Sequence, residues 1–191
     1  AVTCGTGIVV PLDKALPANE IESLIIRSGV QAIFFSSKYN DIMKDIKARN
    51  TTDLRYYISM DISEKTDWMY SQEEFIQKGK DLIQKGNRKF LDATIDNEKM
   101  SIMLFTSGTT AMSKAVQLSQ KNICTNIMDI ASVIKLTPED TLLSFLPLHH
   151  TFECTVGFLY VPYSGASIAF CEGIRHIADN IREYKITAMI S

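Results

Sequence analysis

The sequence contains few cysteines, and their spacing is irregular. They include no CxxC pair and no dense framework, and they are Cys4, Cys124, Cys154 and Cys171. Disulfide-rich secreted domains and cysteine-based zinc sites both require closely spaced cysteines. We therefore expect reduced thiols in a cytoplasmic location, and we interpret the four residues as core or incidental positions rather than redox or metal-binding ones.

The sequence also has no excess of one charge sign. Its 20 Lys and Arg residues oppose 22 Asp and Glu residues, which gives a formal net charge of −2. This balance offers no electrostatic basis for binding nucleic acid or an anionic membrane surface.

Long uninterrupted apolar runs are missing as well. The start of the chain lacks a basic region followed by a long apolar run, so we expect no signal peptide. Residues 154–171 carry no charge, and this segment is nearly as long as the ~20 residues that a membrane span requires. Pro162 and the turn at 163–165 divide the segment in two. We predict a buried helix followed by a strand there, and no transmembrane segment.

The composition is that of a globular chain. Its 191 residues, 46% apolar and 22% charged, suit one domain with a core of its own. Both ends of the chain lie in apolar sequence, without a capping signal at the start or a covering segment at the end. We therefore expect the chain to be a piece of a longer protein.

Strands and helices are predicted to alternate along the chain. The predicted strands lie near 9–10 and over 32–35, 55–58, 101–105, 115–118, 141–146, 166–170 and 187–190. Five helices are predicted: 17–29, a segment that Ser37 caps, 71–86, a segment that begins at Ser119, and 175–184. The helix 71–86 begins with a capping box made by Ser71 and Glu74. The helix from Ser119 presents one apolar face, made of Ile123, Ile127, Ile130 and Ile134. This alternation predicts an α/β fold with a mostly parallel sheet and helices on both faces.

A hydroxyl-rich loop follows the predicted strand 101–105. Thr106, Ser107, Thr109 and Thr110 place four hydroxyl groups around Gly108. Hydroxyls and backbone N–H groups in a glycine-containing turn can donate several hydrogen bonds to phosphate oxygens, and Lys114 adds a mobile positive charge. A polar surface turn without function is the alternative, because Ser, Thr and Gly are ordinary loop residues.

The loop is not a Walker A motif. Ser113 stands where that motif has its second glycine, and Ala115 stands where it has a magnesium-binding Ser or Thr. A Walker loop also opens a helix at its lysine, whereas residues 115–118 are predicted to form a strand. The expected layout is strand, loop, strand.

That layout and those residues resemble the adenylate-forming, or AMP-binding, superfamily, whose loop reads TSGTTGxPKG. Six of the nine specified positions match, and Ala111, Ser113 and Ala115 depart. Ala111 replaces a glycine that could require a positive φ, where a Cβ costs about 1 kcal/mol or more. The departure puts the loop geometry or the nucleotide affinity in question.

Two further stretches resemble the same superfamily. The sequence VPLDKALP at 10–17 is similar to the family's VPLDPxLP segment, and LPLHHTFE at 146–153 is similar to the LPLAHxFE segment of long-chain acyl-CoA synthetases (long-chain fatty-acid–CoA ligases). The three matches occur in the family's order over nearly the whole chain. The resemblance implies that residues 1–191 are a fragment of the large N-terminal AMP-binding domain, without the small C-terminal domain.

The resemblance also implies an activity and its residues. A carboxylic acid, expected to be a long-chain fatty acid, attacks ATP in the presence of Mg²⁺ to give an acyl-adenylate, and CoA then takes the acyl group. The implied nucleotide-binding residues are Thr106, Ser107, Gly108, Thr109, Thr110 and Lys114. Lys114, Thr109 and His150 are the implied catalytic residues, and His150, Phe152 and Glu153 the implied contacts of the acid.

The remaining histidines are interpreted without a role in chemistry. His149 is expected to be a partly exposed loop residue and His176 a surface residue of a helix. A metal site made by His149 with His150 is not expected, because adjacent side chains in extended backbone point apart. We assign no metal ligand in this chain.

Several family features are missing from the sequence: a Tyr-Gly-x-Thr-Glu motif, a ribose-binding aspartate, a hinge and a C-terminal lysine. We therefore expect this fragment alone to be inactive. Two alternatives stay open, a non-catalytic module that keeps the fold and an adenylation domain that serves a carrier protein instead of CoA. A fatty-acid substrate would make a peripheral membrane contact plausible.

Overall fold

The computed structural model describes residues 2, 6–106 and 113–190. The chain divides into two compact units, one made of residues 14–94 and the other of residues 1–13 with 95–191. Each unit has its own sheets and its own buried side chains, and each is described separately.

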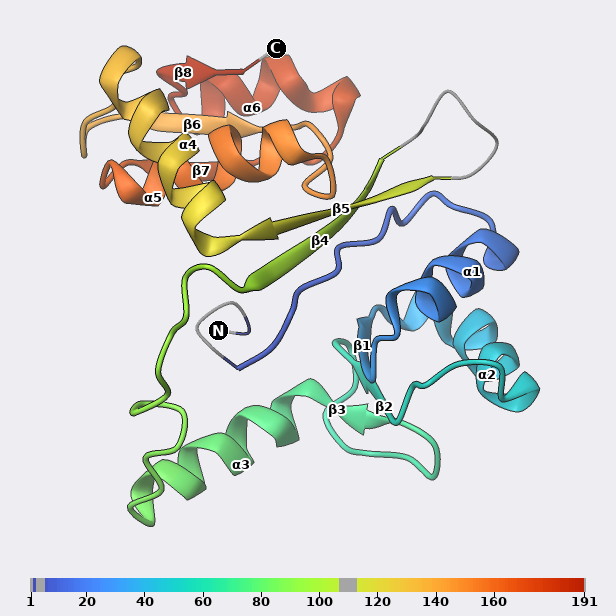
Figure 1. Ribbon diagram of the computed structural model, residues 1–191. Coiled ribbons are helices and arrows are strands. Elements are labelled where there is room, and N and C mark those ends of the chain that lie inside the picture. The colour runs from blue at the N-terminus through green and yellow to red at the C-terminus, as the bar shows by residue number, and fades with distance from the viewer. Residues whose placement is uncertain (1, 3–5, 107–112, 191) are drawn as a thin grey trace. The chain divides into compact units, whose positions relative to one another are not determined.

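The unit 14–94 is built on a small parallel sheet (Figure 1). Its strands, in the order β1-β2-β3, are β1 (Ala32–Phe35), β2 (Tyr56–Ser59) and β3 (Tyr70–Ser71). Its helices are α1 (Ala18–Ser28), α2 (Asn40–Arg49) and α3 (Gln72–Gln84). The helix predicted over 17–29 is confirmed as α1, which buries Ile21, Leu24 and Ile25 on one face.

Helices α1 and α2 end for the same reason. Gly29 follows α1 with φ 62°, and its N–H donates to the carbonyls of Ile25 and Ile26. Asn50 follows α2 with φ 52°. Gly and Asn are the residues that most readily adopt this left-handed conformation, so the local sequence sets both helix ends.

The two predicted serine caps of this unit have different outcomes. Ser71 caps α3, because its side chain accepts hydrogen bonds from the N–H groups of Glu73 and Glu74. The predicted cap by Ser37 is wrong. A 3-10 turn over Ser37–Tyr39 precedes α2, and the Asp61 carboxylate accepts from the Ser36 hydroxyl and from both the N–H and the hydroxyl of Ser37.

The second unit begins with an antiparallel hairpin. Its strands are β4 (Met100–Thr106) and β5 (Lys114–Ser119), and Val9 makes an isolated parallel bridge to Ile102. The N–H of Val9 donates to the carbonyl of Ser101, and the N–H of Met103 donates to the carbonyl of Val9, both at 2.9 Å. Strand β4 therefore has hydrogen-bonded neighbours on both sides.

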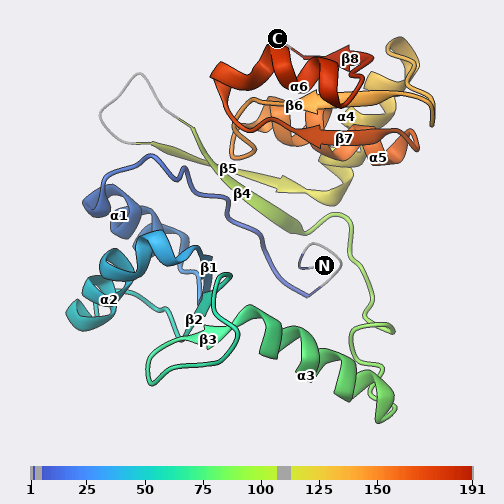
Figure 2. The ribbon, with the colours of Figure 1, turned by 180° about the vertical axis from the view of Figure 1, so that it is seen from behind.

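The rest of this unit is a second α/β layer. After α4 (Gln120–Val133) come β6 (Thr141–Ser144), a π-helix over Glu153–Leu159, α5 (Tyr160–Tyr163), β7 (Ser167–Phe170), α6 (Ile177–Glu183) and β8 (Ala188–Met189). The parallel strands lie in the order β7-β6-β8. Figures 1 and 2 show α4 and α6 on opposite faces of this sheet.

The core of this unit joins the hairpin to α4. Ile102, Leu104, Ile123, Ile127 and Tyr160 form one buried cluster, and Ile130 packs against it. The prediction that Ile134 belongs to the apolar face of this helix is wrong. Ile134 lies one residue beyond α4 in an extended conformation and is 46% exposed. Residues spaced three and four apart share one face only within the helix, so the spacing makes no prediction for a residue beyond its end.

The predicted fold class is confirmed. The fold is α/β, and the strands pair mostly in parallel, although they are divided over three small sheets within the described residues. Residues 154–171 form a helix that buries Tyr160 and Val161 and then strand β7, as predicted. In the part of the chain that the structure describes, no helix has the length and apolar character needed to cross a membrane.

Candidate functional site

The hairpin β4–β5 positions the first group of predicted site residues. Its register pairs Phe105 with Ala115 and Thr106 with Lys114, so the predicted layout of strand, loop and strand is confirmed. Thr106 ends β4 and Lys114 begins β5. These two residues therefore stand opposite each other at the base of the loop.

The remaining loop residues, Ser107, Gly108, Thr109, Thr110 and Ala111, lie outside the described residues. Strand β4, which leads into the loop, is well fixed. Leu104 in β4 is 2% exposed, and the Val9 bridge holds the other edge of that strand.

The base of this hairpin suits an anionic ligand. Lys114 is exposed and Thr106 is half-buried, so an ammonium group and a hydroxyl group lie next to a glycine- and hydroxyl-containing loop. Lysine is a mobile point charge with three donors, and a hydroxyl can donate to a phosphate oxygen. This combination can neutralise and orient a phosphate group.

A second group of predicted residues lies in the turn after β6. The N–H of His150 donates to the carbonyl of Pro147 at 2.9 Å, and the N–H of Cys154 donates to the carbonyl of His150 at 3.0 Å. The N–H of Phe152 donates to His150 Nδ1 at 3.3 Å. The imidazole thus accepts at Nδ1, and in its neutral form it carries its proton on Nε2 as a donor.

His150 and Phe152 are open to a ligand. His150 is exposed and the Phe152 side chain is 47% exposed. An exposed aromatic ring beside an oriented imidazole can contact the apolar body of an acid and donate a hydrogen bond to its carboxylate. The arrangement matches the implied role of both residues in binding an acid, which stays a prediction.

Glu153 follows these residues in the chain but turns to the interior. It is 1% exposed, and its Oε1 accepts a hydrogen bond of 2.5 Å from the hydroxyl of Ser144, the last residue of β6. The implied contact between Glu153 and the acid also stays a prediction. Sequence reasoning missed Ser144, because a serine at the end of a short apolar strand carries no signal of its own.

His149 connects two of the motif segments. Its Nε2 lies 3.6 Å from Asp13 Oδ2, with both side chains about one third exposed. The predicted partial exposure of His149 is therefore confirmed, and its contact with Asp13 was not predicted. The contact links the segment 10–17 with the segment 146–153.

The cysteines of this region show no activation. Burial raises the pKa of the Cys154 thiol, and the negative charge of Glu153 raises that pKa further. Cys171 donates from its Sγ to the carbonyl of Gly173 at 3.1 Å. A raised pKa keeps a thiol protonated at neutral pH and makes it a poor nucleophile.

Comparison with known proteins matches residues 4–191 to the family model described as AMP-binding enzyme. A protein named CoA ligase from Gibberella moniliformis is 33% identical over 164 residues, which cover 85% of this chain and 24% of that protein. Long chain acyl-CoA synthetase 4 from Arabidopsis thaliana is 27% identical, over 93% of this chain and 28% of that protein. The chain thus spans about a quarter of the length of these two relatives.

Solved structures agree on the fold. A red-emitting luciferase from Phrixothrix hirtus superposes with a TM-score of 0.80 at 17% identity, over 97% of this chain and 36% of the luciferase. The anthranilate CoA ligase AuaEII in complex with anthranoyl-AMP gives a TM-score of 0.74 at 17% identity, over 96% of this chain and 35% of that structure. Likeness at this level of identity shows a shared fold.

Proposed function

This chain belongs to the family of AMP-binding enzymes, and from that premise we propose that it is part of a ligase that activates a carboxylic acid as an acyl-adenylate and transfers the acyl group to CoA. Residues 1–191 form, in this proposal, a fragment of the large N-terminal domain of that ligase. The fragment alone is expected to be inactive.

One observation carries the proposal. The hairpin register pairs Thr106 with Lys114 at the base of the hydroxyl-rich loop, so a hydroxyl and a cation stand at the two ends of the segment 107–113. Strand β4 is also hydrogen-bonded to Val9 on its other edge. Preorganised donors stabilise a developing charge more effectively than water, because they need no reorganisation during the reaction.

The loop is assigned to the phosphates of ATP. Residues Thr106, Ser107, Gly108, Thr109 and Thr110 hold the β- and γ-phosphates together with Lys114. When the acid attacks the α-phosphate, negative charge builds on the departing pyrophosphate, and these donors stabilise it. Loss of one such donor typically raises a barrier by roughly 3–4 kcal/mol.

The turn after β6 is assigned to the acid. Phe152 contacts the apolar part of the substrate, and His150 donates from Nε2 to the carboxylate and orients it towards the α-phosphate. The hydrogen bond from the Phe152 N–H to His150 Nδ1 supports this role, because it leaves the other ring nitrogen as the donor.

The metal that accompanies ATP is not assigned to this chain. Over residues 2, 6–106 and 113–190, no group of three or more His, Cys, Asp or Glu side chains is placed to hold a metal ion. Mg²⁺ in phosphate-transfer sites is bound largely by the substrate phosphates, and these residues add no ligand set for it.

A long-chain fatty acid is the substrate class that we favour. The segment 146–153 resembles that of long-chain acyl-CoA synthetases. One relative is named long chain acyl-CoA synthetase 4, from Arabidopsis thaliana, and another long-chain-fatty-acid–CoA ligase 5, from Rattus norvegicus. Other relatives bear only the name CoA ligase, so the acid has to be tested by class. A cytoplasmic location and a transient membrane contact with a lipid substrate belong to the same proposal.

ATP–pyrophosphate exchange by the full-length protein tests the proposal. Short, medium, long-chain and aromatic acids are supplied one at a time, before any CoA is added. Exchange with one class establishes adenylation, identifies the acid and shows that Ala111 is tolerated. Absence of exchange with every acid, in a protein shown to be folded, contradicts the proposal and favours a non-catalytic module.

A second step of the same experiment identifies the acceptor of the acyl group. After exchange is found, the release of acyl-thioester is measured with CoA and with a phosphopantetheinylated carrier protein. Transfer to CoA supports the ligase, whereas transfer to the carrier alone identifies an adenylation domain.

A further inference from the structure

Glu153 is a buried acid that the proposed chemistry does not use. Its side chain is 1% exposed, and its partner Ser144 is 5% exposed. Burial of a carboxylate costs several kcal/mol unless hydrogen bonds compensate. A hydrogen bond of 2.5 Å between Ser144 Oγ and Glu153 Oε1 lies in the short range found when one partner is charged.

Gly157 makes room for this carboxylate. A methyl group built on Gly157 would overlap the Glu153 side chain, with the added carbon only 2.6 Å from Oε1. Gly157 is buried, four residues after Glu153 on the same π-helix. Only glycine therefore lets the carboxylate fold back along the helix, and π-helical turns of this kind occur frequently at functional sites.

Ser144, the partner of Glu153 in this hydrogen bond, is part of the parallel sheet. It ends β6, pairs with Phe170 of β7, and accepts at its carbonyl from the N–H of Cys171 at 2.9 Å. Its neighbours Leu142 and Leu143 are 3% and 1% exposed. The hydroxyl is thus held on a buried strand with a neighbour on each side, which is a rigid support.

The exposed residues of the turn are attached directly to this anchor. Glu153 follows Phe152 in the chain, and the N–H of Cys154 donates to the carbonyl of His150. A shift of the helix start at Glu153 moves His150 and Phe152 with it. Displacement of a catalytic group by about 1 Å can cost about 100-fold in rate.

We infer that Ser144, Glu153 and Gly157 form a buried anchor that positions His150 and Phe152 against the acid. In this inference Glu153 supports the site from the interior, in place of the direct contact with the acid that the family resemblance implies for it. The inference rests on the proposed function, since it assigns the supporting residues of that same site. Ser144, Glu153 and Gly157 are positioning residues.

Exchange kinetics of variants in the full-length protein test the anchor. Ser144→Ala and Gly157→Ala are expected to lower kcat of ATP–pyrophosphate exchange about tenfold or more, with the KM for ATP unchanged because the loop is untouched. Glu153→Gln is expected to keep most of the activity, since the amide oxygen still accepts from Ser144, whereas Glu153→Ala is not. Equal losses in Glu153→Gln and Glu153→Ala would overturn the inference, because they would make the charge itself essential.

Ser59→Ala is the matched control. Ser59 is a fully buried serine that ends β2 in the other unit, so this variant removes a comparable strand-end hydroxyl. Its exchange kinetics are expected to equal those of the wild type. If Ser144→Ala behaves like Ser59→Ala, the anchor does not position the site.

A second readout does not depend on activity. The rate at which a thiol reagent modifies Cys154, followed by mass spectrometry of its peptide, is expected to rise several-fold in Ser144→Ala and Gly157→Ala and to stay unchanged in Ser59→Ala. If the wild type shows no exchange but Cys154 responds in this way, the proposed function fails and the anchor stands. Unchanged Cys154 rates in both variants would refute the anchor whether or not exchange occurs.

Discussion

Lys114 is the residue on which the nucleotide assignment depends most directly. It is exposed, it begins β5, and it stands opposite Thr106 in the hairpin register. A charged donor at this place acts on the charge that develops during pyrophosphate departure and not on the fold, because its side chain is not part of the core.

We predict that Lys114→Ala in the full-length protein slows adenylation at least about tenfold without changing the thermal midpoint of unfolding. The rate of acyl-adenylate formation in a single turnover measures the effect. Lys80→Ala removes the same charge from an exposed position on α3 and is expected to leave the rate unchanged. An unaltered rate in Lys114→Ala would remove this lysine from the mechanism.

The site residues differ in how far the sequence predicts them. Thr106, Lys114, His150 and Phe152 lie in motifs, and the structure leaves them half-buried or exposed at a strand end or in a turn. The inward direction of Glu153 was not predictable, because it depends on a π-helix and on space at Gly157. The pairing of Asp13 with His149 likewise depends on a contact between distant segments.

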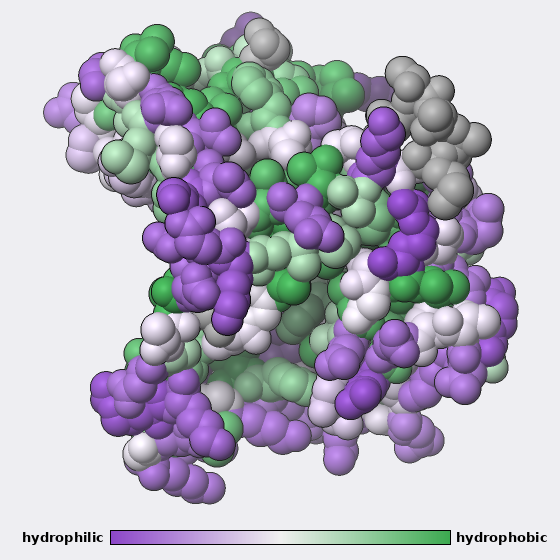
Figure 3. Space-filling view, in the orientation of Figure 1, coloured by the Kyte–Doolittle hydropathy of each residue, from purple (hydrophilic) through white to green (hydrophobic). Residues whose placement is uncertain are grey.

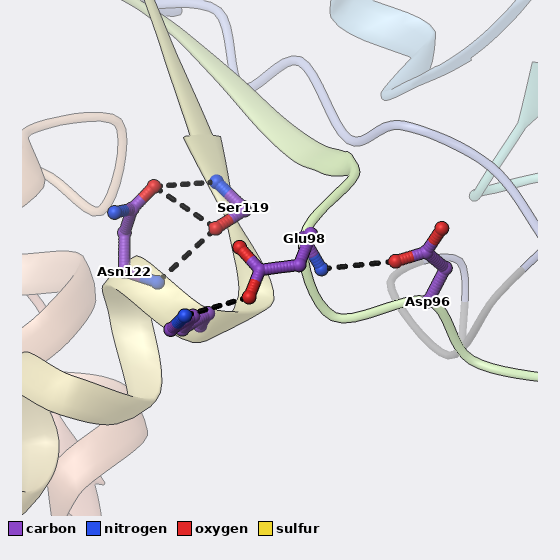
Figure 4. Close-up of polar contacts among 5 residues, drawn as sticks. Asp96, Glu98, Ser119 and Asn122 are labelled. Carbon is purple, nitrogen blue, oxygen red and sulfur yellow. Dashed lines mark hydrogen bonds and ion pairs between the residues drawn. The ribbon is translucent and has the colours of Figure 1, made fainter.

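Among the elements, α4 begins where the sequence places it, and its first turn is held by several contacts (Figure 4). The Ser119 hydroxyl accepts from the Asn122 N–H at 3.2 Å, while Asn122 Oδ1 accepts from the Ser119 N–H at 3.0 Å. Lys121 pairs with Glu98 at 2.6 Å, and the Glu98 N–H donates to Asp96 at 3.1 Å. The capping box satisfies backbone groups that a helix start otherwise leaves unpaired.

Ser119→Ala is expected to lower the free energy of unfolding by about 1 kcal/mol, since it removes the N-cap acceptor. Ser132→Ala provides the comparison on the same helix, because Ser132 is exposed and its hydroxyl donates to the carbonyl of Asp129 near the helix end. That variant is expected to change stability by less than about 0.5 kcal/mol. Urea unfolding measures both, and equal effects would show that the cap contributes nothing specific.

Acid sensitivity is expected at the start of α2. The hydrogen bond from the Ser36 hydroxyl, followed by those from the N–H and hydroxyl of Ser37, lowers the pKa of Asp61 from its ordinary value of 3.8. Because the pKa of Asp61 is lower in the folded state than in the unfolded state, the ionised carboxylate stabilises the fold when the pH is above the unfolded-state pKa. This contribution is lost as the pH falls below 3.8 and through the lower folded-state pKa.

Asp61→Asn is therefore expected to reduce hydrogen-exchange protection of the α2 amides at neutral pH. Below pH 3.8, the protection of these amides should fall less in the variant than in the wild type, because the variant has no carboxylate to protonate. Asp45→Asn removes an exposed carboxylate from the same helix and should retain the wild-type acid dependence. An acid profile of Asp61→Asn identical to that of the wild type would contradict the assigned role.

Elements with strong local signals were predicted correctly, and those that depend on distant partners were not. The apolar spacing located α1 and the start of α4, and the glycine at position 29 located the end of α1. The 3-10 turn before α2 is held by Asp61, which is 24 residues from Ser37 in the chain. Local sequence cannot reveal a contact that tertiary structure supplies.

At the scale of the whole molecule, the sequence indicated the α/β class but not the division into two compact units. Strand propensity and helix spacing are local, whereas sheet partners are fixed by contacts between distant segments. The surface also carries exposed large apolar side chains. Figure 3 shows apolar side chains at the surface of the part that carries α4, α6 and β8. Among the exposed apolar residues, Val133 and Ile174 are each 82% exposed.

The proposed reaction begins when the carboxylate of an acid attacks the α-phosphate of ATP. Full-length protein is supplied with ATP, CoA and an acid labelled with ¹⁸O in its carboxyl group, and the mass of the AMP released is measured. Attack at the α-phosphorus makes an acid oxygen the bridging atom, and this oxygen leaves with AMP when the thiol takes the acyl carbon. We predict one ¹⁸O atom in AMP. Unlabelled AMP, or label in inorganic phosphate from an acyl phosphate, would show that the acid does not attack the α-phosphorus.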